Sequence, residues 1–399
     1  MPGHRPLLLL RRPRIVRSPR VSGTTRDSLR YPPRPRSGVE PLVEPRIQRP
    51  RIADVAREAG VSKTAVSFAF NSPDRLAPET AERIRDIARQ LGYTPHPVAR
   101  MLTQRQTMTI GVLTPQALSV IFSNPFFGAF SEGVALAAEE HGYGLHFISP
   151  LHGSLIHAMT RATVDGVVAI GLADGHPEVE QIRRAGLPIV LVDSLALPEH
   201  GSVEIDDVGG AQAAGAYIAS LGHRDVLVLG VEPPAPGAAD PDGVTARRLR
   251  GYREAFRAVE VDIPDDRVVV GPATIDGGIT AVRAAWDAGI RPTAILAMSD
   301  AMAIGAMRAL RDLRLDVPGD VSVVGFDDID LAPHVDPPLT TVHQPIRRKG
   351  EEAVRALLTV VERRGQASPE HRRLETRLIV RGSTGPVPQH RREVTGRPG

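Results

Sequence analysis

A short polar set, Lys63, Thr64 and Ser67, is spaced so that its members share one face of a helix. An ammonium and two hydroxyls on one face can hydrogen-bond to phosphates and base edges, which is the chemistry of DNA recognition. Ser62 directly precedes them, and a Ser in this place is typical of the N-cap that begins a helix. The spacing therefore predicts a short helix after Ser62, whose exposed polar residues would face DNA if the helix belongs to a DNA-binding motif.

A second set consists of carboxylates that follow apolar runs, namely Asp193, Asp300, Asp327 and Asp328. If these runs are parallel strands, the carboxylates gather at one edge of a sheet and line a cleft. A single Asp in such a place often only caps a helix. The guanidinium of Arg248 could form paired hydrogen bonds to a carboxylate, a phosphate or vicinal hydroxyls. Alternatively, Arg248 could belong to a surface ion pair.

Two aromatic residues, Phe126 and Phe127, follow Asn124 and Pro125 in the chain. In a loop that faces the cleft, their rings would suit a sugar or a purine, although either ring could instead pack in the core or between the lobes. Trp286, the only Trp, is expected to be a packed helix residue. No His-Glu-x-x-His, P-loop or Gly-x-Ser-x-Gly motif occurs. We therefore predict no catalytic residue, no metal site and no cofactor.

The elements that must position Lys63 follow from apolar spacing. Apolar residues recur at i, i+3, i+4 and i+7 over 52–59, and Gly60 follows where a tight turn needs positive φ. A second apolar face runs over 65–69, and a third helical stretch ends at Leu91. Two short helices joined by a glycine turn form a helix-turn-helix, whose second helix enters the major groove. An ordinary helical hairpin has the same spacing.

From Thr109 onward, short Val, Ile and Leu runs alternate with Ala-rich helical stretches. This alternation is typical of parallel sheets. The expected strands are 109–113, 144–148, 166–170, 188–192, 203–205, 226–229, 267–270, 293–297 and 321–324. They are too many for one comfortable doubly wound sheet, so we predict two α/β lobes with a cleft at the carboxyl ends of their strands.

Composition narrows the class of protein. The 399 residues include 49 Lys and Arg against 46 Asp and Glu, so any attraction to DNA must come from local charge. The chain has no Cys, which excludes disulfides and thiolate metal sites. The apolar run 7–10 is far shorter than the ~20 residues of a membrane span. We expect a cytoplasmic protein that has no membrane partner.

These patterns predict a small all-α headpiece with a hinge helix, followed by the two-lobed core. The expected divisions are a disordered Arg- and Pro-rich tail over 1–46, the headpiece over 47–92, the hinge over 93–107, the core over 108–385 and a tail over 386–399. The N-terminal lobe is expected at about 108–206 and 344–365, and the C-terminal lobe at about 207–343 and 366–385. The composition after Gly382 predicts disorder from that point.

The headpiece closely resembles that of the LacI/GalR family of bacterial regulators. The resemblance rests on the helix-turn-helix, on the segment 71–80 that leads to the third helix, and on the Pro-punctuated segment 92–102. It continues through the core in motifs such as Leu221-Gly-His-Arg224 and Val324-Gly-Phe-Asp-Asp328. The resemblance implies a core like that of type I periplasmic binding proteins.

The resemblance also implies roles for individual residues. It implies that Lys63, Thr64 and Phe68 face base edges in the groove and that Ser62 and Ser67 contact phosphates. The whole implied DNA-binding set is Ser62, Lys63, Thr64, Ser67, Phe68, Asn71, Val98, Ala99 and Leu102. Within it, Leu102 is the apolar wedge that the hinge helix inserts into the minor groove. The implied effector contacts are Phe126, Phe127, Asp193, Arg248, Ser299 and Asp327.

Four residues depart from the family pattern. Phe68 stands where many members have Arg, so contact with a thymine methyl or a packing role replaces a contact with guanine. His96 replaces a common Asn in the hinge, and Ser299 replaces the usual Asn of the cleft. Ala77 replaces a Ser N-cap, a loss of about 1 kcal/mol to the third helix.

The expected function is that of a repressor that binds a pseudo-palindromic operator as a homodimer. A small molecule in the cleft, sugar-like or purine-like and expected to be a carbohydrate, would control it allosterically. A solute-binding protein with the same core is the alternative from another class, but it would need an export signal, which we do not find. An enzyme on an α/β core would need one of the missing motifs.

Overall fold

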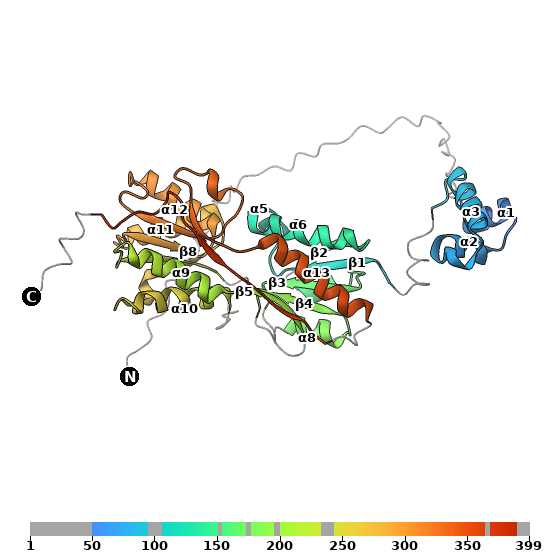
Figure 1. Cartoon of the computed structure of the whole chain (residues 1–399), viewed down its shortest axis with the longest axis horizontal. Coiled ribbons are helices and arrows are strands. Elements are labelled where there is room, and N and C mark those ends of the chain that lie inside the picture. The colour runs from blue at the N-terminus through green and yellow to red at the C-terminus, as the bar shows by residue number, and fades with distance from the viewer. Residues whose placement is uncertain are drawn as a thin grey trace, which may run out of the picture. The chain divides into compact units, whose positions relative to one another are not determined.

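The computed structural model describes residues 50–94, 106–150, 154–172, 177–194, 200–232, 243–363 and 368–388. Internal contacts divide the chain into two compact units, with a boundary between Gln106 and Thr107. The helical unit before this boundary, drawn in blue in Figure 1, and the α/β unit after it are described separately.

The helical unit packs three short helices around a core of its own. Its elements are α1 (Ile52–Glu58), α2 (Lys63–Asn71), the 3-10 turn η1 (Pro73–Arg75) and α3 (Pro78–Gln90). Val55, Val66 and Ile84 contribute one fully buried side chain from each helix. Gly60 has a φ of 64°, and the Oγ of Ser62 accepts a hydrogen bond of 3.1 Å from the first turn of α2. The predicted helix-turn-helix is therefore formed as its spacing indicates.

The N-terminal lobe of the second unit contains a six-stranded parallel sheet in the order β11-β5-β4-β3-β1-β2. Its strands are β1 (Thr109–Leu113), β2 (Gly144–Ile148), β3 (Gly166–Ile170), β4 (Ile189–Val192), β5 (Gly201–Ile205) and β11 (His371–Leu374). Every residue of β3 and β4 is buried. Continuous apolar strands of this kind are typical of a sheet with helices on both faces.

The C-terminal lobe repeats the plan with a sheet in the order β12-β10-β9-β8-β6-β7, in which only β12 is antiparallel to its neighbour. Its strands are β6 (Val226–Val231), β7 (Val268–Gly271), β8 (Ala294–Ala297), β9 (Ser322–Asp327), β10 (Thr340–His343) and β12 (Arg377–Ile379). The two sheets confirm the predicted fold class of two parallel α/β lobes.

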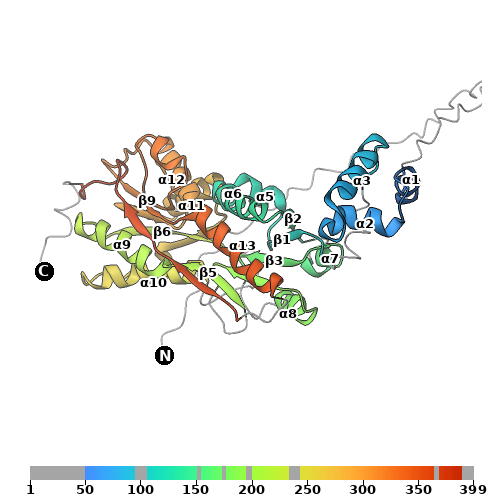
Figure 2. The ribbon, with the colours of Figure 1, turned by 45° about the vertical axis from the view of Figure 1, so that its right-hand side comes forward.

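Helices cover both faces of each sheet (Figures 1 and 2). The N-terminal lobe has α5 (Leu118–Ser123), α6 (Pro125–Glu140), α7 (Leu155–Met159), α8 (Pro177–Arg184) and α13 (Ile346–Glu362). The C-terminal lobe has α9 (Asp207–Ser220), α10 (Val244–Arg257), α11 (Ile275–Asp287) and α12 (Asp300–Asp312). Gly133 and Gly350 let α6 and α13 touch, because a Cβ on either would lie within 2.4 Å of the other helix's backbone. Across the described ranges, no helix has both the length and the apolarity to span a membrane.

Strands β10, β11 and β12 were not among the expected strands. Each has only three or four residues, and β11 and β12 are rich in Arg, so neither apolar runs nor alternation marks them. The lobe boundary near the C-terminus was also misplaced. Residues from 366 were assigned to the C-terminal lobe, but β11 pairs with β5 in the N-terminal sheet. The chain therefore returns to the C-terminal lobe only after Leu374.

The prediction of disorder after Gly382 is also wrong for the residues that immediately follow. Ser383 is fully buried and its Oγ donates to the carbonyl oxygen of Val323 at 2.6 Å. Farther along, the N–H of Val387 donates to the carbonyl oxygen of Leu221 at 3.0 Å. These hydrogen bonds hold the segment against the C-terminal sheet although its composition alone resembles a tail.

Candidate DNA-binding surface and effector site

The start of α2 presents polar groups to solvent. Ser62, Lys63 and Thr64 are exposed, whereas Ser67 and Phe68 are half-buried. Free N–H groups at a helix N-terminus attract anions, so this end of α2 suits a phosphate as well as base edges. The Lys63 ammonium adds a positive charge there. This surface has the groups that a DNA backbone requires.

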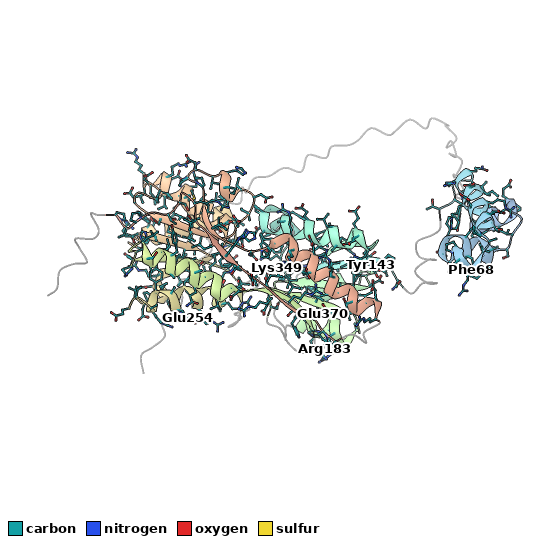
Figure 3. All side chains as sticks on the ribbon, viewed as in Figure 1. Phe68, Tyr143, Arg183, Glu254, Lys349 and Glu370 are labelled. Carbon is teal, nitrogen blue, oxygen red and sulfur yellow. The ribbon has the colours of Figure 1, made fainter. Side chains whose placement is uncertain are left out.

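Phe68, labelled in Figure 3, lies farther along the same helix. The guanidinium carbon of Arg75 lies 5.3 Å from its ring centroid. Asn71 donates from Nδ2 to the Oγ of Ser67 at 3.2 Å, so these two members of the predicted set stabilise each other. The hinge residues Val98, Ala99 and Leu102 lie outside the described residues, as does His96.

A buried ion cluster joins α9 to α10 where the lobes meet. Oδ2 of Asp207 accepts from Nε and Nη2 of Arg247 at 3.0 and 2.8 Å, and Oδ1 accepts from Nε of Arg248 at 2.8 Å. Arg248 also donates to the carbonyl oxygen of Met298 at 2.5 Å, and its guanidinium lies 3.6 Å above the ring of Phe326. The predicted effector arginine is thus held in place by groups of the protein itself.

Lys349, on α13, carries a second part of this cluster and is labelled between the two lobes in Figure 3. Its side chain is fully buried, and Nζ donates to Oδ1 of Asp193 and to Oε1 of Gln344, each at 2.6 Å. Gln344 in turn donates from Nε2 to Oδ1 of Asp327 at 2.6 Å. Because α13 belongs to the N-terminal lobe and Asp327 ends strand β9 of the other, these bonds link the lobes.

Two more contacts close the bonds into a ring. Nη2 of Arg247 donates to the backbone oxygen of Asp193 at 3.1 Å, and Nη1 of Arg248 lies 3.9 Å from Oδ1 of Asp327. The structure therefore brings together three predicted effector residues from both lobes. We call the seven residues the interlobe ring: Asp193, Asp207, Arg247, Arg248, Asp327, Gln344 and Lys349. It contains three cations and three carboxylates.

The backbone at the strand ends aims these carboxylates. Asp193, which follows β4, has a φ of 61°, and Asp327, which ends β9, has a φ of 131°. Positive φ in a residue other than Gly costs on the order of 1–3 kcal/mol, and such residues cluster at functional sites. The fold thus accepts strain at both carboxylates, one in each lobe, where the ring forms.

Charge and burial act in opposite directions within the ring. Burial disfavours ionisation of Asp207, but Arg248 and Arg247 outweigh it and hold the pKa of this carboxyl below its ordinary value. At Asp327, burial prevails and raises the pKa, against the opposing effects of Arg248 and the Gln344 amide. The net shift of the pKa is therefore downward at Asp207 and upward at Asp327.

The remaining predicted effector residues take different places. Phe126 and Phe127 are half-buried at the start of α6, with ring centroids 5.3 Å apart in an edge-to-face contact. The centroid of the Phe126 ring lies 5.3 Å from the Lys349 ammonium, so this ring borders the interlobe ring. Ser299 is N-cap of α12, and its Oγ accepts from the N–H of Met302 at 3.2 Å.

Other residues singled out from the sequence have structural partners. Asp300 lies inside the C-terminal lobe, where its carboxylate accepts from Thr341 at 2.5 Å, and Asp328 pairs with Arg381 at 2.7 Å. Trp286 is half-buried on α11, as expected of a packed helix residue. Among the residues with described positions, no cluster of His, Cys, Asp or Glu could hold a metal ion.

Four members of the interlobe ring were missed: Asp207, Arg247, Gln344 and Lys349. One of them carries a readable signal in the sequence. Lys349 occupies the apolar stripe of α13, in register with buried Ile346, Ala353 and Leu357. A lysine in such a stripe needs a buried partner. Asp207 and Arg247, by contrast, each stand beside a residue of the same charge and carry no comparable signal.

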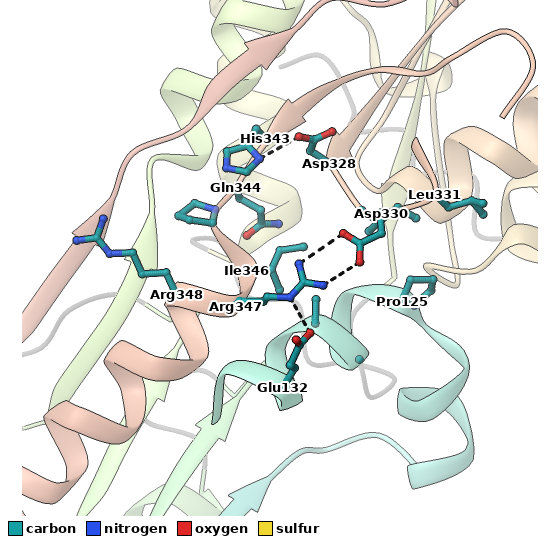
Figure 4. Close-up of a pocket in the computed structure, with 14 residues that line it drawn as sticks. Pro125, Glu132, Asp328, Asp330, Leu331, His343, Gln344, Ile346, Arg347 and Arg348 are labelled. Carbon is teal, nitrogen blue, oxygen red and sulfur yellow. Dashed lines mark hydrogen bonds and ion pairs between the residues drawn. The ribbon is translucent and has the colours of Figure 1, made fainter. Parts of the chain in front are cut away.

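A separate hollow of about 530 Å³ lies beside this site (Figure 4). It is lined by the start of α6, the loop after β9 and the start of α13. Arg347 spans it, with Nε donating to Glu132 at 2.6 Å and Nη2 to Asp330 at 2.8 Å. None of the six predicted effector residues lines the hollow, and among the ring residues only Gln344 does. Of the predicted effector residues, Asp193, Arg248 and Asp327 are instead bonded into the interlobe ring.

Comparison with known proteins identifies two family models. The model described as "Bacterial regulatory proteins, lacI family" matches residues 51–96, and the model described as "Periplasmic binding protein-like domain" matches residues 216–384. The first covers the helix-turn-helix, and the second covers most of the C-terminal lobe.

Whole-length relatives agree. The transcriptional regulator CelR of Thermobifida fusca is 33% identical over 348 residues, which cover 85% of this chain and 99% of CelR. The ribose operon repressor of Escherichia coli K12 is 31% identical over 340 residues, covering 83% and 98%. Both relatives are regulators of transcription and not enzymes.

Two solved structures share the fold. A CelR–cellobiose complex has a TM-score of 0.62 at 31% identity and covers 84% of this chain and 100% of its own. A lac repressor dimer bound to operator and the anti-inducer ONPF has a TM-score of 0.70 at 25% identity and covers 85% and 100%. The chain therefore belongs to the LacI family and is a DNA-binding transcriptional regulator with a periplasmic-binding-protein-like effector domain.

Proposed function

We propose that the protein is a repressor that binds a pseudo-palindromic operator as a homodimer and responds to a neutral carbohydrate held between its lobes. The observation that carries the proposal is the interlobe ring. It brings together carboxylates from both lobes and Arg248 from the C-terminal lobe, beside the aromatic side chain of Phe126. Alternating hydrogen-bond donors and acceptors next to an aromatic face suit a polyhydroxylated ring.

On the DNA side, α2 would lie in the major groove. Lys63 and Thr64, both exposed, would reach base edges, and Phe68 would contact a thymine methyl. Ser62 and Ser67 would bind phosphates. From the hinge, Val98, Ala99 and Leu102 would enter the minor groove. The DNA set also includes Asn71, which supports Ser67 through its hydrogen bond.

Large apolar side chains on the N-terminal lobe support the dimer. Val120 and Phe122 on α5 are 42% and 60% exposed, and Leu136 on α6 is 52% exposed. The two helices lie side by side in Figures 1 and 2. Large apolar side chains that stay exposed are common at interfaces, and a self-complementary contact through these two helices would present two headpieces to two half-sites. The lac repressor was solved as a dimer bound to its operator.

The charge balance of the interlobe ring supports a neutral effector. Arg247, Arg248 and Lys349 already face three carboxylates, so a phosphate would meet no unneutralised cation there. Hydroxyl groups can replace the contacts of Asp193, Arg248 and Asp327 one by one. Ser299, Phe126 and Phe127 complete the proposed effector set. The solved complex of CelR holds cellobiose, which agrees with this class.

Control of DNA binding would follow from exchange of these contacts. A sugar that bridges Asp193 in one lobe and Asp327 in the other favours one spacing of the lobes, whereas the operator favours its own. The effector can shift the equilibrium between these two lobe arrangements by no more than the difference between its binding free energies for them.

Thermal unfolding tests the effector class on the purified protein. Cellobiose and ribose serve as neutral sugars, with adenosine and glucose 6-phosphate as competing classes. We expect a neutral sugar to raise Tm, since a ligand that binds only the folded state stabilises it, and to change the affinity for operator DNA. A rise in Tm with adenosine or glucose 6-phosphate alone would overturn the carbohydrate assignment.

A further inference from the structure

The side chain of Lys349 is fully buried, although the residue on its helix just before it, Arg348, is exposed. An ammonium in such a place is costly unless it is paired and hydrogen-bonded. Here the Asp193 carboxylate supplies the charge and the Gln344 carbonyl supplies a second acceptor. Lys349 is therefore a buried, paired member of the interlobe ring and not a solvent-exposed charge on the helix surface.

The chemistry of the ammonium fixes the orientation of its neighbour. A lysine ammonium has three N–H donors and no acceptor, whereas a glutamine amide has one acceptor end and one donor end. The end of Gln344 that meets Lys349 must therefore be Oε1. Its Nε2 is then turned toward Asp327, where it donates at 2.6 Å.

We propose that Lys349 is a positioning residue of the effector site, which orients the Gln344 amide toward Asp327 and so links the ionisation and placement of that carboxylate to the N-terminal lobe. The inference rests on the proposed function only in taking Asp327 as an effector contact. The lysine acts through Gln344, because Nζ makes its hydrogen bonds to Asp193 and Gln344 and none to Asp327.

Asp327 is surrounded by groups from several elements. Arg248 faces it from α10, Asp300 from α12, Gln344 from the end of β10 and Lys349 from α13, with Asp207 and Asp328 close by. Burial already raises its pKa, while the Gln344 amide and the Lys349 charge lower it. Loss of the oriented amide must raise the pKa further.

A carboxyl with a raised folded-state pKa makes the folded protein less stable as pH rises toward that pKa. The decline ends once the group is ionised. In Lys349→Met we expect the decline in Tm to extend to higher pH than in the parent protein, by roughly one pH unit. Thermal unfolding between pH 5 and 8 without effector measures this shift. Adding Asp327→Asn should abolish it.

A double-mutant cycle with Gln344→Met separates positioning from charge. If the lysine acts through the amide, Gln344→Met shifts the pH profile as Lys349→Met does, and the double variant shifts it no further. Additive shifts, or a Lys349→Met profile equal to that of the parent, would overturn the proposal. If Lys349→Met does not fold, the same cycle in an Asp193→Asn background avoids leaving an unpaired carboxylate. Because this test uses no sugar, its outcome is independent of the effector class.

Discussion

The proposed DNA-binding surface and the proposed effector site contain similar side chains, but the first is exposed and the second is buried. On α2, Lys63 and Thr64 stand in solvent, and their proposed partners arrive only with the DNA. In the interlobe ring, Lys349 and Arg248 are buried, and their partners already belong to the protein. We therefore expect substitutions on the first surface to cost little stability and substitutions of the buried charges in the second to cost more.

This difference explains how one chain can serve two ligands. When exposed Lys or Arg side chains neutralise DNA phosphates, counterions condensed on the DNA are released, and this release favours binding. A neutral sugar brings only hydroxyls, which must compete with hydrogen bonds that exist already. In the site proposed for the sugar, Asp193 and Asp327 both have positive φ, so the fold commits free energy to the placement of these two carboxylates.

The largest effect should follow from Asp207→Asn, which leaves two buried guanidiniums with one neutral partner. Breaking a buried ion pair costs about 3–5 kcal/mol of stability. Chemical denaturation measures this loss. Asp312→Asn is the matched control, because Asp312 also pairs with two arginines, Arg283 and Arg308, but at the surface. It should cost about 1 kcal/mol or less. Equal losses in the two variants would refute the contrast between buried and exposed charge.

Next in size is the effect of Arg248→Lys on effector binding. The variant keeps the positive charge but loses the planar guanidinium, which donates to Asp207 and to the Met298 carbonyl oxygen at the same time. Hydrogen bonds to charged groups are worth ~1.5–3 kcal/mol, so affinity for the effector should fall roughly 10- to 100-fold. Calorimetric titration with the sugar that raises Tm measures it, and Arg250→Lys on the same helix is the control. An unchanged affinity would remove Arg248 from the site.

Thr64→Ala and Ser67→Ala should separate base reading from backbone contact. Loss of a base contact costs ~1–3 kcal/mol on the specific site alone, whereas loss of a phosphate contact weakens all DNA about equally. We therefore expect Thr64→Ala to reduce discrimination between operator and random DNA, and Ser67→Ala to preserve it. Fluorescence anisotropy on both DNAs gives the two affinities, with exposed Gln90→Ala as control. The reverse pattern would exchange the two roles.

The smallest effect concerns the helix that supports this surface. Ala77 precedes α3 without a side-chain cap, and its φ and ψ of −58° and 134° suit an N-cap residue. Ala77→Ser should stabilise the headpiece by about 1 kcal/mol and leave base preference unchanged. Unfolding of the headpiece followed by circular dichroism measures the gain. A variant no more stable than the parent would show that Pro78 and the η1 turn already fix the helix start.

The two regions also differed in how far the sequence predicted them. Helix periodicity, Gly60 and Ser62 determine the headpiece locally, so the residues of α1 to α3 were predicted without tertiary information. Apolar runs similarly located nine of the strands. Strands β10, β11 and β12 escaped because their stability comes from pairing with distant neighbours and not from their own residues.

The interlobe ring lay largely beyond sequence reasoning. Asp193, Arg248 and Asp327 were predicted as cleft residues, and all three belong to the interlobe ring, Asp193 through Arg247 and Lys349. Which groups neutralise them could not be read, because the partners come from α9 and α13, at sequence positions up to 156 residues away. Two adjacent aspartates, Asp206 and Asp207, look alike in sequence, yet one caps α9 and the other holds two arginines.

The most direct test of the account is selection of bound sequences from sheared genomic DNA at ~0.15 M salt, where specific and nonspecific binding separate. A dimer with exposed reading residues on each α2 predicts enrichment of a palindrome with a flexible pyrimidine–purine step at its centre. Sequence-independent binding that disappears as salt rises would contradict the account, because the headpiece would then supply charge but no base readout.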